Sequence, residues 1–235
     1  TFAKYLEAEL GQTIVVKNVV GGGGSAGYIA ARQARPDGYT LVTIQGDLAK
    51  YVPAKLAPIK IEEFDIIDGF AVQSPILIVR SESAWKNLAD FVAAAKAAPG
   101  KLTVGVSDIS GVHHVPVVLW SEVAGIQLRA IAHAGSTQMN AAILGGHVDA
   151  VSRYIRPAIP YIQQGTLRPL AYFGSKRPVA LPDVPTFKEL GYNVVWNQAY
   201  GIGGPAGLPA QVKEKLAKAT QAVNANPQFQ KDLDK

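Results

Sequence analysis

Hydrophobic and polar positions along this chain alternate between two periods from one end to the other. Apolar residues recur at helical spacing in several windows: residues 2–10, 25–35, 87–98, a stretch ending at 124, 137–144, 157–164 and a last one starting at 209. Short apolar or β-branched runs lie between these windows, at residues 13–16, 39–44, 75–79, 102–106, 128–133, 148–152, 167–173 and 194–202. Helices that alternate with strands predict an α/β fold.

The glycine-rich stretch at residues 21–27 satisfies the G-x-G-x-x-G pattern through Gly22, Gly24 and Gly27, and Asp47 follows at the expected distance. This pattern is typical of dinucleotide-binding sites, so an NAD(P)-dependent oxidoreductase is the alternative function. Lys17 and Asn18 interrupt the preceding apolar run, however, and the helix after the glycines ends early, at residues 36–38. A plain glycine loop is the competing interpretation.

Composition narrows the class of protein. With 235 residues, 48% of them hydrophobic, the chain can bury a substantial core. No apolar run reaches the roughly 18 residues that a bilayer span needs, so we expect a soluble protein, either cytosolic or secreted and processed. The absence of cysteine excludes thiol chemistry and disulfides. The net charge of +5 comes from scattered basic residues, which argues against nucleic-acid binding and favours small anions.

Ordered motifs across nearly the whole chain resemble one family. They are residues 18–27, 35–41, 144–150, 164–171, 176–191 and 204–209. The set resembles the periplasmic receptors of tripartite tricarboxylate transporters, also called Bug solute-binding proteins. The segment 176–191 is the most specific of these matches.

The resemblance implies a two-lobed type II periplasmic binding protein. Lobe one is expected at residues 1–102, joined by 197–235, and lobe two at residues 103–196. Such a receptor closes its lobes by a hinge movement over a small carboxylate, such as a dicarboxylate, an amino acid or an aromatic acid, and delivers it to membrane permease subunits. We expect a periplasmic monomer without a cofactor. The family begins with a strand and a glycine-rich loop, whereas this sequence opens inside the helix that follows them.

The first candidate ligand loop precedes a helix, where free N–H groups and the helix dipole attract carboxylates. The resemblance places the family's ligand loop at residues 107–114, and its candidate ligand residues are Ser107, Ser110, Gly111, Val112 and His113. An ordinary helix cap at Ser110 is the competing interpretation. Adjacent histidines point to different faces and lack an i, i+4 partner, so no metal site is expected.

Further candidates lie on three other segments. Gly135, Ser136 and Thr137 begin a second helix, where capping alone is an equal explanation. Arg153 follows a predicted strand and could hold a carboxylate with two hydrogen bonds, although an arginine there can also be a solvated charge. The segment Gln45, Gly46 and Asp47 stands where the family has a hydroxyl-rich loop.

Catalytic motifs are missing from the sequence. It contains no G-x-S-x-G, H-E-x-x-H or P-loop pattern, and its histidines have no evident relay partner. We therefore interpret the chain as a binding protein rather than an enzyme. Asp149 is expected to bond to nearby backbone, and Trp196 to pack in the core or at the hinge.

Overall fold

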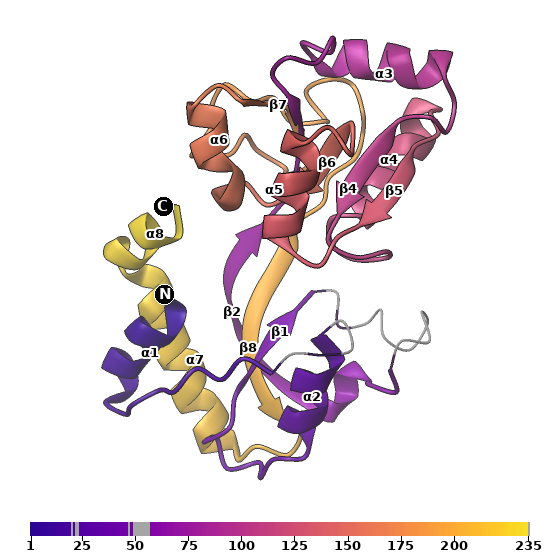
Figure 1. The fold of residues 1–235 in the computed structure, drawn as a ribbon. Coiled ribbons are helices and arrows are strands. Elements are labelled where there is room, and N and C mark those ends of the chain that lie inside the picture. Colours follow the sequence, from indigo (N-terminus) through magenta and orange to yellow (C-terminus); the bar gives the residue numbers. More distant parts are fainter. Residues whose placement is uncertain (20, 22–23, 47, 49–56, 235) are drawn as a thin grey trace. The chain divides into compact units, whose positions relative to one another are not determined.

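The computed structural model describes residues 1–235 except 20, 22–23, 47, 49–56 and 235, and it divides into two compact units (Figure 1). Unit 1 comprises Thr1–Val72 and Gln198–Lys235, and unit 2 comprises Gln73–Asn197. The alternation of helices and strands confirms the α/β class.

Unit 2 contains a five-stranded sheet in the order β5-β4-β6-β3-β7. Its strands are β3 (Ile76–Arg80), β4 (Thr103–Val106), β5 (Arg129–Ala132), β6 (Ala150–Arg153) and β7 (Leu167–Tyr172). β4 is parallel to both β5 and β6, whereas β3 is antiparallel to β6 and β7. Residues 76–79 are fully buried, as their unbroken apolar run predicts for a strand covered on both faces.

Helices cover both faces of this sheet. The core on one face includes residues of α3 (Leu88–Ala97) and α4 (Val115–Ala124), with Phe91 and Trp120 among them. The core on the other face includes residues of α5 (Ser136–Leu144), such as Met139, and is flanked by α6 (Ile159–Gln163) after a 3₁₀ turn at Arg156–Ala158. Neighbouring strand residues alternate between these cores: Leu77 belongs to the first and Ile78 to the second.

The connections of unit 2 diverge at two neighbouring strands. From β4 the chain runs through α4 to β5, whereas from β6 it runs through α6 to β7 on the other side. The carboxyl ends of β4 and β6 therefore form a topological switch point, where open α/β sheets bind their ligands.

Unit 1 has a three-stranded sheet, in the order β1-β8-β2. Its strands are β1 (Val42–Gln45), β2 (Phe64–Gln73, which ends one residue into unit 2) and β8 (Gln198–Pro205), with a 3₁₀ turn at Ile61–Glu63. Its helices are α1 (Phe2–Leu10), α2 (Ser25–Arg32), α7 (Ala210–Ala225) and α8 (Pro227–Asp234). Leu6 of α1, Val223 of α7 and Phe229 of α8 share one core cluster.

The structure differs from the sequence-based expectations in three places. The first division between units falls after Val72 rather than at residue 102, because β3 is hydrogen-bonded between β6 and β7 in the sheet of unit 2. Residues 13–16 form no strand, and Val15 and Val16 are largely exposed. β2 was not predicted: aspartates and a glycine break its alternation, and only Phe64 in it is buried.

Candidate functional site

Predicted ligand residues of unit 2 meet at one edge of its sheet. Because β4, β5 and β6 are parallel, the loops after Val106, Ala132 and Arg153 all leave the sheet at the same edge. This carboxyl edge is the one at the switch point, and it brings together the candidate loop 107–113, the start of α5 and Arg153.

Arg153 is the last residue of β6 and is only 1% exposed. Its Nη1 donates a hydrogen bond to Asn140 Oδ1 on α5. Its Nε and Nη2 have no hydrogen-bond partner among the described residues. Burial lowers the pKa of this guanidinium, although arginine stays charged in proteins. The interpretation of Arg153 as a solvated charge is therefore wrong.

His113 lies in the loop after β4 and is 7% exposed. Its Nδ1 is 2.7 Å from Ser107 Oγ, and Ser107 Oγ donates a 2.6 Å hydrogen bond to Asp108 Oδ1. The ring packs edge-on against Tyr154, with centroids 4.6 Å apart. Burial lowers the pKa of His113 from 6.5 to about 4; Arg153 also lowers it, and Asp108 opposes the shift. His113 is therefore neutral at pH 7, and its Nε2 is buried without a partner among the described residues.

Further unpartnered polar atoms are buried at the same edge. Ser152 Oγ, next to Arg153, and His133 Nε2, in the loop after β5, have no hydrogen-bond partner among the described residues. Buried polar groups are rarely left unsatisfied, because each costs about 1–3 kcal/mol. Their concentration here makes this edge the candidate place for binding polar groups from outside the described residues.

The loop after β4 is shaped by Gly111 and Ser110. A Cβ atom at Gly111 would collide with the carboxylate of Asp108, so glycine lets Asp108 fold over the loop towards Ser107. Ser110 has φ of 66°, a left-handed conformation, and its N–H donates to His114 Nδ1 at 3.0 Å. α4 begins after His114, so the competing interpretation of Ser110 as its cap is wrong. Val112 is half-buried.

The second candidate loop is more exposed. Gly135, with φ of 102°, is the N-cap of α5, and no side chain caps this helix. Ser136 and Thr137 are exposed in its first turn. Asn140, one turn further along α5, is the residue that contacts Arg153, and no motif in the sequence marks it as a site residue.

The remaining candidates belong to unit 1. The backbone N–H of Gln45 donates to Tyr28 Oη at 3.1 Å, and that of Gly46 donates to the Ala199 carbonyl at 2.9 Å. These bonds hold the end of β1 beside β8 and α2. Asp47, together with Gly22 of the G-x-G-x-x-G pattern, lies outside the described residues.

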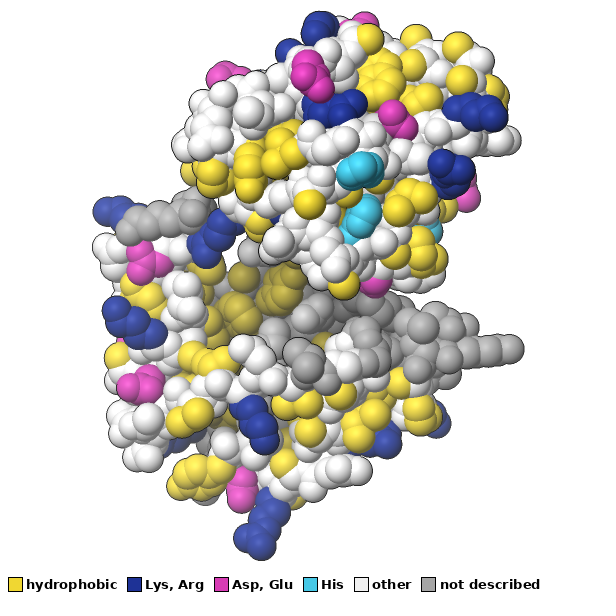
Figure 2. All heavy atoms as spheres, viewed as in Figure 1, with side chains coloured by type: hydrophobic (Ala, Val, Ile, Leu, Met, Phe, Trp, Pro, Cys, Tyr) yellow, Lys and Arg dark blue, Asp and Glu magenta, His cyan; other side chains and the backbone are white. Residues whose placement is uncertain are grey.

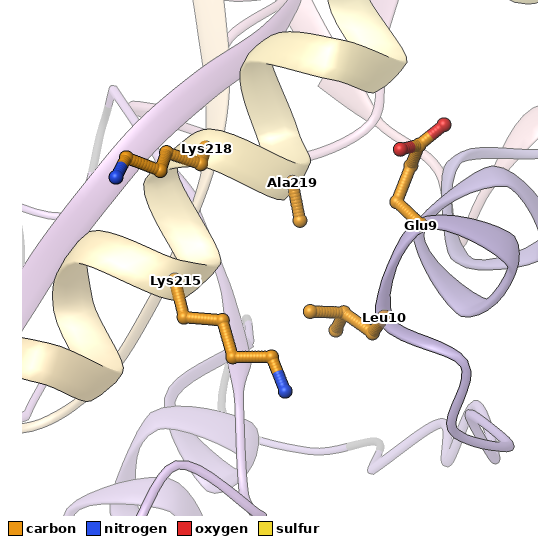
Figure 3. Close-up of a pocket in the computed structure, with 5 residues that line it drawn as sticks. All are labelled: Glu9, Leu10, Lys215, Lys218 and Ala219. Atoms are coloured by element: carbon orange, nitrogen blue, oxygen red, sulfur yellow. The ribbon is translucent and has the colours of Figure 1, made fainter.

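A pocket of about 260 Å³ lies elsewhere in unit 1, between α1 and α7 (Figure 3). Glu9 and Leu10 of α1 line it together with Lys215, Lys218 and Ala219 of α7, and the Lys218 side chain extends away from α1. Both lysines are exposed, and Lys218 Nζ pairs with Glu214 at 2.7 Å. No candidate ligand residue lines this pocket.

Three further properties of the described residues concern surface charge, metal binding and membrane spans. Lys and Arg side chains are scattered over the face that Figure 2 shows, rather than gathered in one patch. Within the described part of the chain, no group of three or more His, Asp and Glu side chains could hold a metal ion. No helix there has both the length and the apolar character needed to cross a membrane.

Comparisons with known proteins give the family context. A family model described as "Tripartite tricarboxylate transporter family receptor" matches residues 1–235. The "UPF0065 protein in gbd 5'region" of Cupriavidus necator is 32% identical over 96% of this chain and 69% of its own length. Several curated relatives are longer than this chain, which spans 66–69% of their length.

Solved structures agree with this match. One titled "Structure of a periplasmic transporter" has a TM-score of 0.88 and 30% identity, over 99% of this chain and 79% of that one. MatC from Rhodopseudomonas palustris with bound malate has a TM-score of 0.84 over 99% of this chain and 80% of that one. At 23% identity, the second shows likeness of fold only. The predicted periplasmic binding protein fold is thus confirmed.

Proposed function

Because this chain belongs to the family of tripartite tricarboxylate transporter receptors, we propose that it binds a small carboxylate in the periplasm through Arg153 and passes it to the membrane permease of such a transporter. The family consists of solute-binding receptors and not of enzymes. The family assignment therefore overturns the alternative function, an NAD(P)-dependent oxidoreductase.

The observation that carries the proposal is the buried, half-satisfied guanidinium of Arg153. Nε and Nη2 form one side of the planar fork that binds a carboxylate with two parallel hydrogen bonds. In Arg153 these two nitrogens have no partner among the described residues, while Nη1 is fixed by Asn140. A buried positive charge without a counter-charge is costly. A ligand carboxylate at this position would supply the negative charge and the hydrogen-bond acceptors that water supplies to an exposed guanidinium.

Two further observations support a carboxylate ligand. Arg153 ends β6 at the switch point, beside the loop after β4, which is where the topology of an open α/β sheet favours ligand binding. MatC, which shares the fold, holds malate, a small dicarboxylate. The ligand of this chain is accordingly proposed as a small organic acid.

A thermal-melt screen with small acids tests the ligand class. A ligand at about 100 times its dissociation constant adds about 2.7 kcal/mol of stability. For a protein of this size the melting temperature should then rise by roughly 5–10 °C. A broad panel of mono- and dicarboxylates that produces no shift in the full-length protein would contradict the proposal.

Calorimetric titration of Arg153 variants tests the residue. Arg153→Ala removes a charge-assisted pair of about 1.5–3 kcal/mol, so affinity for the best acid should fall about tenfold to more than a hundredfold. Arg153→Lys should recover only part of this loss, since an ammonium lacks the planar fork. Arg129→Ala is the matched control: it removes an exposed arginine at the start of β5, at the opposite edge of the sheet. Equal affinity of wild type and Arg153→Ala would refute the role of Arg153.

A further inference from the structure

The proton on Ser107 fixes the state of His113. A serine hydroxyl carries one proton, and Ser107 uses it to donate a 2.6 Å hydrogen bond to the carboxylate of Asp108. The 2.7 Å contact between Ser107 Oγ and His113 Nδ1 therefore needs its proton from the histidine. His113 is thus the tautomer protonated at Nδ1, and the chain of bonds runs from His113 through Ser107 to Asp108.

The second ring nitrogen of His113 is consequently an acceptor. Burial and the positive charge of Arg153 both disfavour the doubly protonated ring, so the imidazole is neutral at pH 7. Nε2 then carries a lone pair and no proton. It is buried, and among the described residues no donor reaches it. An unsatisfied acceptor of this kind is stabilised by an O–H or N–H group and not by another acceptor.

This acceptor lies beside the proposed carboxylate partner. His113 packs its ring against Tyr154, the residue that follows Arg153 in the chain. The strands that lead to the two residues, β4 and β6, are hydrogen-bonded neighbours, with Gly105 opposite Val151. The charge of Arg153 is near enough to act on the imidazole. The free donors of the Arg153 guanidinium and the free acceptor Nε2 of His113 therefore lie at the same edge of the sheet.

From this pairing we infer that the ligand carries a hydrogen-bond donor, a hydroxyl or an amine, near the carboxylate that Arg153 holds, and that His113 Nε2 accepts this donor. The inference rests on the proposed function and narrows its ligand class to hydroxy acids or amino acids. A second ionised carboxylate at the same place has no proton to give and would face the lone pair of Nε2. Plain mono- and dicarboxylates should consequently bind more weakly.

Matched pairs of acids test the inference on the full-length wild-type protein at pH 7. Each pair differs by one group: lactate against propionate, both enantiomers of malate against succinate, and both enantiomers of 2-hydroxyglutarate against glutarate. L-Aspartate and L-glutamate separate an amine from a hydroxyl as the donor. For the chain length that fits, we expect the donor-bearing acid to bind about tenfold more tightly or better, as calorimetric titration measures.

A variant links this preference to His113. His113→Phe keeps a ring against Tyr154 but removes the acceptor, so the ratio of affinities for the donor-bearing and the plain acid should fall towards one. His147→Phe, which replaces an exposed histidine after α5, should keep the preference.

The outcomes separate the two claims. Equal binding of both members of every pair, with affinity still dependent on Arg153, would overturn the inference and leave the proposed function standing. A preference that persists in His113→Phe would also overturn it. If none of these acids binds, while another carboxylic acid of the broad panel still raises the melting temperature, the inference is overturned and the proposed function stands.

Discussion

The two ends of strand β6 treat a charged side chain in opposite ways. At the amino end, Asp149 Oδ2 accepts hydrogen bonds from the backbone N–H and the hydroxyl of Thr103, at 2.8 and 2.7 Å. At the carboxyl end, Arg153 is fully buried, yet two of its three guanidinium nitrogens have no partner among the described residues. The carboxylate of Asp149 is thus bonded within the sheet, whereas the guanidinium of Arg153 keeps two donors that no described residue uses.

This difference is expected of an open α/β sheet, in which ligands bind at the carboxyl ends of the strands and not at the amino ends. The amino edge contributes stability through satisfied polar groups, whereas the carboxyl edge leaves buried polar groups unsatisfied, as the ligand site proposed there requires. His113, Ser152 and His133 extend the unsatisfied group at the carboxyl edge. Variants at the two ends should therefore change stability in different directions.

The largest expected effect is a loss of stability in acid that depends on His113. Its pKa is about 4 in the folded protein and 6.5 ordinarily. Below pH 6.5, His113 therefore becomes protonated in the unfolded chain, whereas in the folded chain it stays neutral until about pH 4. The contribution of neutral His113 to stability is complete above pH 6.5 and falls by up to about 3 kcal/mol as the pH drops to 4.

Urea unfolding of wild type and His113→Phe from pH 7 to 4 measures this effect. The variant cannot take up this proton, so its stability should fall less steeply over that range. Measurements above pH 4.5 avoid most of the titration of Glu63, Asp65, Glu189 and Glu214, whose pKa values hydrogen bonds and nearby cations lower. Parallel curves for the two proteins would show that His113 is not a buried neutral group.

The next effect is at the amino end of β6. Asp149→Ala leaves the backbone N–H and hydroxyl of Thr103, a residue only 8% exposed, without their acceptor. Two hydrogen bonds to a charged group are lost, and we expect a destabilisation of about 2 kcal/mol. That corresponds to roughly 4–8 °C in melting temperature. An unchanged melting temperature would mean that the amino edge is not where polar groups stabilise the sheet.

The smallest effect is expected at Arg153 in the ligand-free protein. Arg153→Met replaces a buried, poorly paired charge with an apolar side chain of similar length, so stability should stay the same or rise by about 1 kcal/mol. Chemical denaturation without added acid measures it, and Asp149→Ala is its counterpart at the other end of the strand. A loss of 2 kcal/mol or more would show that Arg153 serves the fold.

Local patterns predicted much of this fold. The unbroken apolar run at residues 75–79 and the helical spacing at residues 2–10 and 87–98 correspond to β3, α1 and α3. The predicted structural role of Asp149 is confirmed by its bonds to Thr103. The ordered motifs identified the family, which the match over residues 1–235 confirms.

Long-range contacts explain what the sequence did not predict. β3 belongs to unit 2 only because β6 and β7 pair with it, and β2 has weak alternation because few of its side chains are buried. The burial of Arg153 comes from contacts that are distant in the sequence, and its one hydrogen-bond partner, Asn140 of α5, lies 13 residues earlier. The ligand-binding roles of all candidate residues, Arg153 and His113 included, stay predictions.

A crystal structure of the full-length protein with its best acid would show directly whether Arg153 holds the ligand. We expect one ligand carboxylate with its two oxygens about 2.7–2.9 Å from Nε and Nη2 of Arg153, while Nη1 stays hydrogen-bonded to Asn140. A ligand carboxylate bound elsewhere, with Nε and Nη2 bonded to the protein or left without the ligand, would contradict it.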